Sequence, residues 1–444
     1  MLKKAENLTD FYNVFQMGAL TEDSFDFYQP TALARTGKRY EFHMDLYNRI
    51  INASDSVRLL VVGHGGCGKS TEFNKLAEVL HKENYAAIVV NATLDLDRNS
   101  FSYVDVIVLI VRNLMQLAED ENVSLSTGLC AAFESALSTE ILSKTTEGTA
   151  ETEVTGKAEA GIGLRGILKL AAALSSSLKM SAGTKTEIRR EIAPRVSDII
   201  EATNALLREI HKKLCAKNSS NCQKLIVIID GLEKCSLELV KNMFLDGSPA
   251  LTMLELDLIM SCPIGFYRSV DFPRVSSYFP NFLTMPMIKI HQPVERAGEN
   301  PEEFEAGIET LMQLVLKRAD ARFFEEGVLK EIILKTGGSL RDLSRALSNI
   351  ALNAKMEGRE TLSLELAREF FQSEGADAFI RIERKDYDCL KKIYTRSYEP
   401  RSDEEYANLL YGSAVFEYNG KRWCDLNPVV RDYIDKKGLG ILDD

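Results

Sequence analysis

The sequence predicts a three-layer α/β core with a mainly parallel sheet, followed by a helical lid and a C-terminal winged helix. Three observations predict this fold class. Short β-rich runs alternate with amphipathic helical patterns in the first two thirds of the chain. A glycine-rich turn joins the first run to a helix, and an Asn–Gly hairpin signal stands near the C-terminus.

Size and composition are those of an ordinary protein with two or three domains. The 444 residues are 45% hydrophobic and 27% charged, with a net charge of −11 that argues against coating nucleic acid. Eight cysteines without CxxC pairs indicate a cytoplasmic protein rather than a zinc site. An apolar leader and a clean transmembrane run are both missing, so we expect neither secretion nor stable membrane insertion.

The clearest motif is GHGGCGKS at residues 63–70, which fits G-x-x-x-x-G-K-[ST]. The β-rich run 57–62 precedes it, and an amphipathic helical pattern follows. Backbone N–H groups in such a loop converge on phosphate oxygens, and the helix N-terminus adds positive charge. The sequence therefore predicts a P-loop that binds ATP and Mg²⁺.

Each residue type in the loop suits a particular contact with the nucleotide. Lys69 would reach the β- and γ-phosphates, Ser70 would offer its hydroxyl to Mg²⁺, and Thr71 would lie near the α-phosphate. The residues we assign to nucleotide binding are Gly63, Gly65, Gly66, Gly68, Lys69, Ser70 and Thr71.

A second apolar strand, in KLIVIIDGLEK at 224–234, ends in Asp230. A carboxylate at this point can hold the metal's water shell beside Ser70. Gly231 follows it, and Glu233 is the nearby carboxylate that could polarise a water; the alternative is a plain loop residue. We assign Ser70 and Asp230 to the metal and Glu233 to catalysis.

The remaining elements complete a core that we place at 57–295. Strands are expected in 85–95, 256–265 and 287–290. In the lead-in, 1–56, the Tyr28–Gln29–Pro30 turn and Arg35–Arg39 line the adenine or belong to a helical segment packed on the sheet. Residues 144–187 are rich in small side chains; we favour a mobile hairpin or loop insertion over a partner contact or a membrane-active segment.

Helices are expected through the lid, 296–379. Ser339 and Asp342 predict a capping box, with Arg341 and Arg345 left free on the helix that follows. Free arginines beside a nucleotide can contact the γ-phosphate, although a solvated helix face is the commoner arrangement.

The last section, 380–444, combines helices with β-rich runs at 414–418 and 421–426 and predicts a winged helix. Its 12 basic and 13 acidic residues lack the basic excess of a DNA-reading wing. Lys421 and Arg422 at the hairpin tip are the basic pair located where a DNA-reading wing would contact DNA. Nucleic acid is therefore a less favoured partner than protein.

In this order, the P-loop, the Asp230 strand, the arginine-bearing lid and the winged helix resemble the AAA+ superfamily. The resemblance is to its initiator-like and STAND-type branch, which includes origin-recognition-type ATPases and bacterial antiphage or signalling ATPases. It implies that Arg341 contacts the γ-phosphate, that Arg274 in DFPRVSSYFP reaches a neighbouring subunit's site, and that Ser261 touches the attacking water. An antiviral role is implied by the resemblance alone.

The sequence departs from that family in two respects. Gly231 stands where the usual catalytic glutamate is found, which implies slow hydrolysis. We see no repeat array after the winged helix, so we expect sensing or effector output from a separate partner. The leading hypothesis is an ATPase switch coupled to self-assembly or a partner; a non-hydrolysing scaffold and a DNA-acting initiator or loader are the alternatives. His64 and Cys67 are interpreted as loop fillers, with oxidation of Cys67 as the alternative role.

Overall fold

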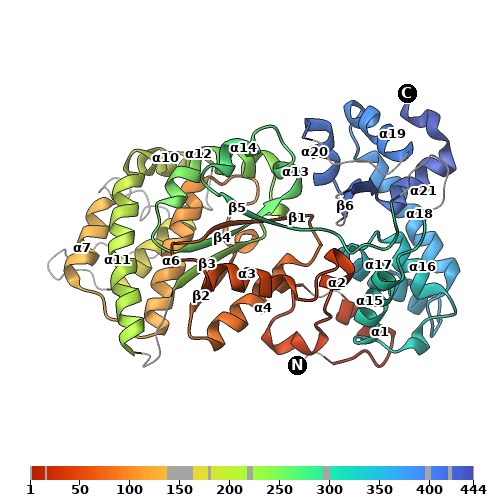
Figure 1. Ribbon diagram of the computed structural model, residues 1–444, viewed down its shortest axis with the longest axis horizontal. Coiled ribbons are helices and arrows are strands. Elements are labelled where there is room, and N and C mark those ends of the chain that lie inside the picture. Colours follow the sequence, from red (N-terminus) through yellow and green to blue (C-terminus); the bar gives the residue numbers. More distant parts are fainter. Residues whose placement is uncertain are drawn as a thin grey trace.

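Five parallel strands form the central sheet in the order β2-β3-β4-β1-β5 (Figure 1). The computed structural model describes residues 3–15, 18–137, 164–178, 182–217, 224–293, 301–395, 402–418 and 423–443. The strands are β1 (Arg58–Gly63), β2 (Ala86–Asn91), β3 (Leu225–Asp230), β4 (Asp257–Pro263) and β5 (Asn281–Met285). Strand β4 lies between β1 and β3. The P-loop, which follows β1, and Asp230, the last residue of β3, therefore lie on either side of β4 at the carboxyl ends of the strands.

One face of the sheet is covered by α3 (Phe42–Ile51) and α4 (Lys69–Lys82). Helix α4 places its apolar residues at helical spacing, and these side chains are buried against alternate residues of β1, β3 and β4. Full burial of each large aliphatic side chain contributes about 1.5–3 kcal/mol. The buried apolar residues of this helix are Phe73, Leu76, Ala77 and Leu80, which agrees with the amphipathic pattern predicted after the glycine-rich turn.

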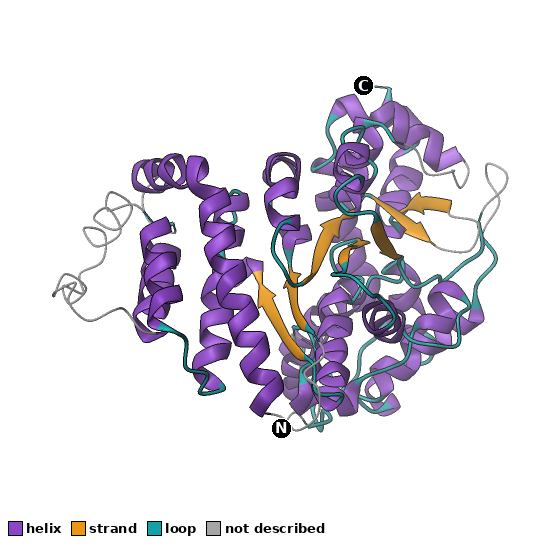
Figure 2. Ribbon diagram, turned by 60° about the vertical axis from the view of Figure 1, so that its left-hand side comes forward, coloured by secondary structure: helices purple, strands orange, loops and turns teal. Residues whose placement is uncertain are grey.

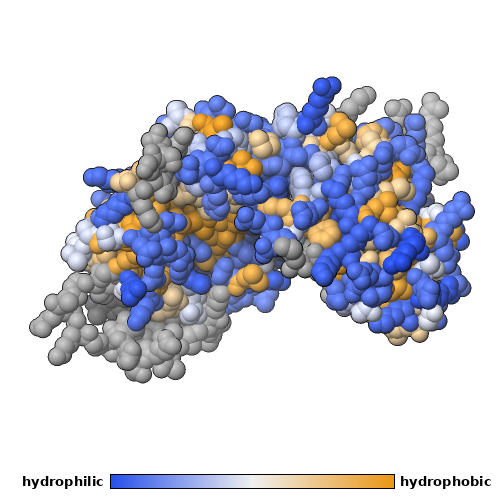
Figure 3. Space-filling model, turned by 90° about the horizontal axis from the view of Figure 1, so that it is seen from below, coloured by the Kyte–Doolittle hydropathy of each residue, from blue (hydrophilic) through white to orange (hydrophobic). Residues whose placement is uncertain are grey.

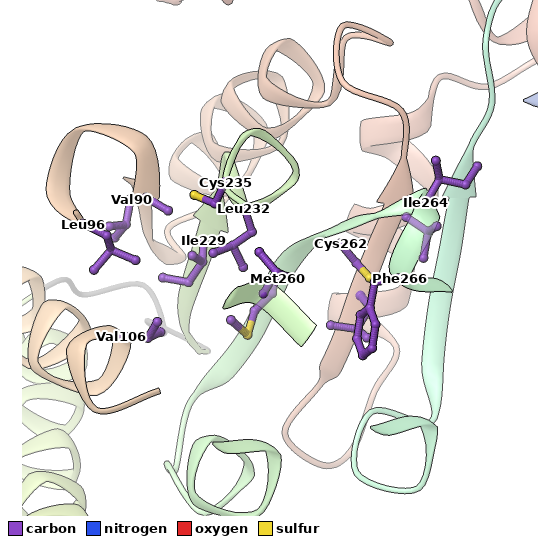
Figure 4. Close-up of a cluster of buried hydrophobic side chains, with 14 of the residues drawn as sticks. Val90, Leu96, Val106, Ile229, Leu232, Cys235, Met260, Cys262, Ile264 and Phe266 are labelled. Atoms are coloured by element: carbon purple, nitrogen blue, oxygen red, sulfur yellow. The ribbon is translucent and has the colours of Figure 1, made fainter. Parts of the chain in front are cut away.

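The opposite face is covered by α6 (Tyr103–Asp120) and α12 (Leu237–Thr252). Figure 4 shows part of this core, where side chains from β2, β3 and β4 meet those of the neighbouring helices. Helices on both faces complete the three layers, and Figure 2 shows them flanking the strands. The predicted α/β class with a parallel sheet is confirmed.

The small-residue segment contains two packed helices, α9 (Leu164–Ser177) and α10 (Ala182–Ile192). The loop interpretation is wrong for these residues. The spacing i, i+3, i+4, i+7 gives α9 one apolar stripe, and that stripe is buried beside α6 and α7 (Thr127–Ala136). The stripe consists of Ile167, Leu170, Ala171 and Leu174. Residues 144–163 and 179–181 lie outside the described residues.

Polar contacts also fix this helical layer to the core. Arg189 on α10 makes two hydrogen bonds of 2.8 Å to the Asp105 carboxylate on α6, and Lys185 is paired with Asp97 at 2.6 Å. The long helix α11 (Val196–Lys217) then returns along the same side, which extends the molecule beyond the sheet (Figure 1).

The lid and the N-terminal lead-in pack on each other at the opposite end of the molecule. Helix α1 contacts α17, and α2 contacts α15. The helices of these two parts are α1 (Leu8–Phe15), α2 (Ala32–Thr36), α15 (Glu305–Leu316), α16 (Val328–Lys335), α17 (Leu340–Met356) and α18 (Leu364–Ile380). The lead-in therefore builds one wall of the lid region, while the proposed domain boundaries themselves stay predictions.

The expected strand at 287–290 is wrong, because the fifth strand is β5, which ends at Met285 just before Pro286. Strand β5 lies at the edge of the sheet and pairs with β1, whose last paired residue is Gly63 opposite Met285, and Pro286 has no N–H group to donate to a further ladder bond. The apolar run after it is buried between the core and the C-terminal section instead. There the Met287 N–H group donates to the Glu417 carbonyl at 3.1 Å.

The C-terminal section contains helices and an antiparallel hairpin. These are α19 (Tyr387–Thr395), α20 (Glu404–Tyr411), β6 (Val415–Tyr418), β7 (Trp423–Leu426) and α21 (Pro428–Lys437). Helices with a hairpin are the elements that a winged helix combines, and that assignment stays a prediction. The hairpin tip, with Lys421 and Arg422, lies outside the described residues.

The surface in Figure 3 is mostly hydrophilic, with hydrophobic side chains in small groups and in one hollowed area. Within the described ranges, none of the helices combines the length and the apolar character needed to cross a bilayer.

Candidate nucleotide site

The P-loop joins the end of β1 to the start of α4, where the motif predicts it. Gly66 and Gly68 have φ values of 88° and 105°, a backbone region that disfavours other residues. A Cβ on Gly63 would lie 2.8 Å from the Met285 carbonyl oxygen of β5. The glycines are thus required by backbone conformation and by a close approach.

Lys69 is 2% exposed at the start of α4, and its ammonium group is turned back into the loop. It donates to the carbonyl oxygens of His64 at 2.8 Å and Gly63 at 3.2 Å, and it lies 3.4 Å from Oε1 of Glu233. Burial opposes its charge, but the negative groups around it outweigh burial and raise the pKa of Lys69. The described site therefore holds a charged lysine.

Ser70 and Asp230 lie together, as the metal assignment requires, since the Ser70 hydroxyl hydrogen-bonds to the Asp230 carboxylate. Burial, and then the nearby Glu233, raise the pKa of Asp230. Its Oδ1 atom is buried without a hydrogen-bond partner among the described residues.

These two residues fit a magnesium ion that is shared with phosphates. A hydroxyl, a carboxylate and an unsatisfied carboxylate oxygen are the donor types that Mg²⁺ takes from a protein beside a nucleotide. In the described part of the chain, no group of three His, Cys, Asp or Glu side chains could hold a metal alone.

Glu233 lies on the short helix Leu232–Lys234 after β3 and is 8% exposed. Burial alone would raise its pKa, but Lys69 and Lys234 and a hydrogen bond from Ser261 lower the pKa of Glu233. Its Oε2 atom has no hydrogen-bond partner within the described ranges. Glu233 is thus an ionised carboxylate beside the lysine of the P-loop, with one oxygen uncommitted.

Ser261 reaches this carboxylate from β4, the strand between β1 and β3. Besides its bond to Glu233, its hydroxyl accepts a hydrogen bond from the Leu232 N–H group at 2.9 Å. The structure thus places Ser261 beside the residue proposed to activate water.

The backbone explains why glycine follows Asp230. Gly231 has a φ of 89°, and a Cβ there would lie 2.9 Å from Cγ2 of Thr93 and 3.3 Å from Oδ1 of Asn91. A glutamate at this position would meet both backbone strain and a steric clash. The carboxylate of this site is instead provided two residues later, by Glu233.

The lid reaches the P-loop through the N-terminus of α17. The Gly66 carbonyl accepts from the Leu340 N–H group at 3.1 Å and the Arg341 N–H group at 3.3 Å. The Arg341 guanidinium lies so close to Gly65 that a Cβ there would be 2.5 Å from Nη2. The structure therefore brings Arg341 to the P-loop.

Two expectations for this helix need correction. Arg345 is not free, because it is paired with Glu374 at 2.5 Å and Asp342 at 3.3 Å. Ser339 caps the helix by accepting from the Asp342 N–H group at 3.3 Å, but the Asp342 side chain is turned to Arg345 rather than back to the cap.

A cavity of about 410 Å³ lies between the P-loop, the lead-in and the lid. Its phosphate end contains the P-loop, Glu233 and Arg341. Its other end is lined by apolar residues of the lead-in and by polar residues of the lid. The lining residues at that end include Val14, Phe15, Leu20, Tyr28, Gln29, Leu314, Arg318, Ser348 and Asn349.

The lead-in lines the cavity in part as expected. Tyr28 and Gln29 line it, whereas Pro30 and Arg39 are not among its described lining residues. Arg35 is 3% exposed and donates to the backbone carbonyls of Cys67 and Pro286. Arg35 also lines the cavity, and its two bonds tie it to the backbone of the P-loop and of the segment after β5; its contact with adenine stays a prediction.

Two further residues of the predicted site, Thr71 and Arg274, lie in different places. Thr71 lines the cavity, and its hydroxyl accepts from the Leu20 N–H group at 3.2 Å. Arg274, on α14 (Phe272–Ser276), has a side chain that is 70% exposed and lies outside the cavity lining, so a site role for it requires a neighbouring subunit.

His64 and Cys67 are not loop fillers. The Glu417 N–H group of β6 donates to Nε2 of His64 at 2.9 Å, and Cys67 is fully buried in a cluster with hairpin side chains. Both residues attach the back of the P-loop to the C-terminal hairpin.

The sequence reasoning missed the polar residues that α17 and the segment after α15 place in the cavity. Ser344, Ser348 and Asn349 lie one to two turns after Arg341 on the same face of α17. Helical spacing from Arg341 is the signal that could have found them. For Arg318 the sequence carries no comparable signal, because a lone arginine near a helix end is usually solvated.

Comparison with known proteins agrees with this geometry. Residues 40–245, slightly less than half of the chain, match the model of the KAP family P-loop domain. This part of the chain has the P-loop NTPase fold, and the predicted resemblance to P-loop ATPases is confirmed. No curated protein matches the chain significantly.

Solved structures of origin-recognition-type proteins are among the structural matches. Cdc6p from Pyrobaculum aerophilum is 12% identical, with 89% of this chain and 93% of that chain covered and a TM-score of 0.37. Orc1 from Aeropyrum pernix in complex with DNA is 12% identical, with 97% and 98% covered and a TM-score of 0.39. Drosophila ORC bound to DNA is 9% identical, with 98% and 92% covered and a TM-score of 0.38. At these scores the likenesses carry no argument about binding or assembly.

Proposed function

We propose that this protein is a switch ATPase, which binds Mg²⁺-ATP, hydrolyses it slowly and couples its nucleotide state to assembly. The observation that supports this most directly is that Lys69, Ser70, Glu233 and Arg341 line a single cavity, with Asp230 hydrogen-bonded to Ser70 beside it. These residues come from the P-loop, β3 and the lid, and together they supply the charges that phosphoryl transfer needs.

In the proposed mechanism, the P-loop N–H groups and Lys69 hold the β- and γ-phosphates, and Arg341 neutralises charge that develops on the γ-phosphoryl group. Mg²⁺, held through Ser70 and Asp230, supplies electrostatic stabilisation of the phosphates when bound. Glu233 takes a proton from the attacking water, with Ser261 holding the carboxylate in place.

The pairing of Lys69 with Glu233 supports slow or regulated hydrolysis. The ammonium group lies 3.4 Å from the carboxylate, so a phosphate bound by Lys69 would compete with Glu233 for it. A phosphate that takes over Lys69 would release Glu233 to act as the base. Nucleotide binding would thus prepare the base within the same site.

Coupling to assembly would pass through the lid. Helix α17 is hydrogen-bonded to Gly66 and carries Arg341, so the γ-phosphate and the lid position are linked through one residue. The exposed Arg274 is available for a neighbouring copy, and a separate sensor or effector protein is the other partner that we consider.

A nucleotide-held scaffold with little hydrolysis is the second candidate. It is favoured by Gly231, whose backbone conformation excludes the usual glutamate, and by the lowered pKa of Glu233, which weakens it as a base. In this case ATP would hold the lid closed without rapid turnover.

The test is to measure ATP turnover and particle mass together for the parent and for Glu233→Gln, with and without Mg²⁺. The switch predicts turnover in the parent, at least a tenfold loss in the variant, and an ATP-bound assembly that persists. EDTA should abolish turnover. Glu238→Gln, an exposed carboxylate on α12, is the matched control and should behave as the parent.

Lys69→Ala tests binding itself. The variant should lose ATP affinity at least tenfold, whereas Lys82→Ala, at the exposed end of the same helix, should not. Unchanged ATP binding in Lys69→Ala would overturn the nucleotide site. If parent and Glu233→Gln both bind ATP and neither hydrolyses it, the scaffold is selected; equal, measurable turnover in both would mean that Glu233 is not the base.

A further inference from the structure

Arg318 lies at the apolar end of the cavity and carries a charge that the surrounding protein does not neutralise. Its side chain is 8% exposed at the end of the lid segment that follows α15, one helical turn after Leu314. Burial lowers its pKa to about 10, with no carboxylate opposing the effect in the described part of the chain. A buried charge without a partner costs several kcal/mol and requires another explanation than packing.

The hydrogen bonds of Arg318 leave much of its guanidinium free. Among the described residues, its one side-chain bond is from Nη1 to the Leu314 carbonyl at 2.7 Å. The group lies over the Phe27 ring, 5.6 Å from its centroid, and lines the same cavity as the P-loop. Nε and Nη2 remain as donors with no bond inside the described protein.

The other side-chain donors at this end of the cavity are already engaged. The Gln29 amide donates to Gln313 at 3.0 Å, and the Asn349 amide donates to the Arg345 carbonyl at 2.8 Å. The Ser348 hydroxyl donates to the Tyr12 carbonyl at 3.3 Å. Each amide keeps one further N–H group, but among the described lining residues of this end Arg318 is the charged donor without a carboxylate partner.

The walls around Arg318 suit a flat aromatic ring. Val14, Phe15 and Leu20 are 4%, 2% and 6% exposed, and together with Leu314 they give this end an apolar lining. A phosphate would lose its hydration there without a second cation, whereas a purine offers apolar faces and unprotonated ring nitrogens at its edge. The chemistry of this end differs from that of the P-loop end.

We propose that Arg318 is the base-recognition residue of the nucleotide site and donates to an acceptor atom on the edge of a purine base. This proposal rests on the proposed nucleotide site, and it adds the residue that distinguishes a nucleotide from a bare phosphate chain. The charge of Arg318 stays buried because the base supplies the acceptor that the protein lacks.

The experiment measures the affinities of two probes, Mg²⁺-ATP and Mg²⁺-tripolyphosphate, for the parent and three variants. Arg318→Met should weaken ATP binding about 10- to 100-fold, because a hydrogen bond to a charged group is lost. It should leave tripolyphosphate binding unchanged, since that probe has no base. Lys69→Ala should weaken both probes, and Arg322→Met, an exposed arginine four residues away, should weaken neither.

Thermal unfolding without nucleotide separates this role from a structural one. Removing an unpartnered buried charge should leave the nucleotide-free Arg318→Met protein at least as stable as the parent. A structural arginine would make the variant less stable. Arg318→Lys, which keeps the charge but lacks the planar fork, should also lose ATP affinity, and it tests the proposal if the methionine variant does not fold.

The outcomes are distinguishable. Equal ATP affinity in Arg318→Met and parent, or equal loss for both probes, overturns the base-recognition role. If Lys69→Ala weakens neither probe, the nucleotide site itself is wrong, whatever Arg318 does.

Discussion

The P-loop has two neighbours of opposite character. On one side it faces the cavity, where Lys69, Glu233 and Arg341 gather beside open space. On the other side it is packed against the C-terminal hairpin, where Cys67 is buried with Phe416. Both surfaces are built by segments more than 200 residues apart. Among the described residues, the cavity side has carboxylate oxygens without a hydrogen-bond partner, whereas the unpartnered atom on the hairpin side is Nδ1 of His64.

Charged groups are treated differently on the two sides. Buried oxygens of Asp230 and Glu233 have no hydrogen-bond partner among the described residues. On the hairpin side, Oε1 of Glu417 accepts from Arg268 at 2.7 Å and from Tyr406 at 2.9 Å, and Oε2 accepts from Arg268 at 2.8 Å. Unsatisfied polar groups belong where a ligand can complete them, and satisfied groups contribute to stability. Changes on the hairpin side should therefore reduce the free energy of unfolding, and changes on the cavity side should reduce ligand binding.

The largest expected effect is that of Glu417→Ala. Removing this carboxylate leaves the half-buried Arg268 without its partner and opens the base of the hairpin. We expect the free energy of unfolding to fall by about 3–5 kcal/mol, as measured by urea denaturation. Glu405→Ala, an exposed carboxylate on α20, should change it by less than about 0.5 kcal/mol. If both variants lose equally little, the hairpin is not a stabilising contact.

His64, which contacts the hairpin, should make the free energy of unfolding depend on pH. Burial, and then Lys69, lower the pKa of His64 to about 3 from its ordinary 6.5. Between these values the unfolded chain binds a proton that the folded protein does not, so stability falls as pH decreases. The free energy of unfolding should lose about 1.4 kcal/mol per pH unit from this residue between pH 6.5 and the acid limit of folding.

His64→Asn isolates that contribution. The difference in the free energy of unfolding between parent and variant should shrink as pH falls from 6.5 to 5, by about 2 kcal/mol. A pH-independent difference would mean that His64 takes up a proton in the folded protein as readily as in the unfolded chain, and would place the histidine nearer to solvent than the structure does.

Local signals explain how much of the cavity side could be predicted. The P-loop, Asp230 and Glu233 each belong to a strand followed by a short turn, and the strand ends of a parallel sheet share one edge. The helix cap at Ser339 and the family resemblance predict the position of Arg341. The apolar end of the cavity, where Arg318 lies, could not be predicted. It combines residues near positions 20, 315 and 348, which no local sequence pattern connects.

The hairpin side shows the limit of apolar patterns. The run after Pro286 is buried as its composition indicates, but it is buried against the hairpin rather than within the sheet. An apolar run predicts burial without naming the partner. The small-residue helix α9 shows the same limit, since its stripe is clear only once α6 is known to lie beside it.

Gly231→Glu sharpens the comparison on the cavity side. The substitution installs the usual glutamate where φ is 89° and where the space is filled by Thr93. We expect the free energy of unfolding to fall by about 1–3 kcal/mol, with no gain in ATP turnover. Gly327→Ala, at φ 80° with open space around it, should show the backbone strain without the clash and should cost less. Faster turnover in Gly231→Glu would mean that Glu233 is not the base.

The smallest expected change in stability is that of Arg341→Ala. Arg341 is an exposed residue, although its guanidinium contacts the P-loop. Its removal should therefore alter the free energy of unfolding by less than about 0.5 kcal/mol. ATP turnover should nevertheless fall at least tenfold, because the positive charge at the γ-phosphate is lost. Lys355→Ala, later on the same helix, should change neither quantity. If Arg341→Ala instead destabilises the protein and leaves turnover intact, the role of the arginine is to hold the lid against Gly65 and Gly66 and not to contact the γ-phosphate. Both sides of the P-loop would then contribute to the stability of the fold.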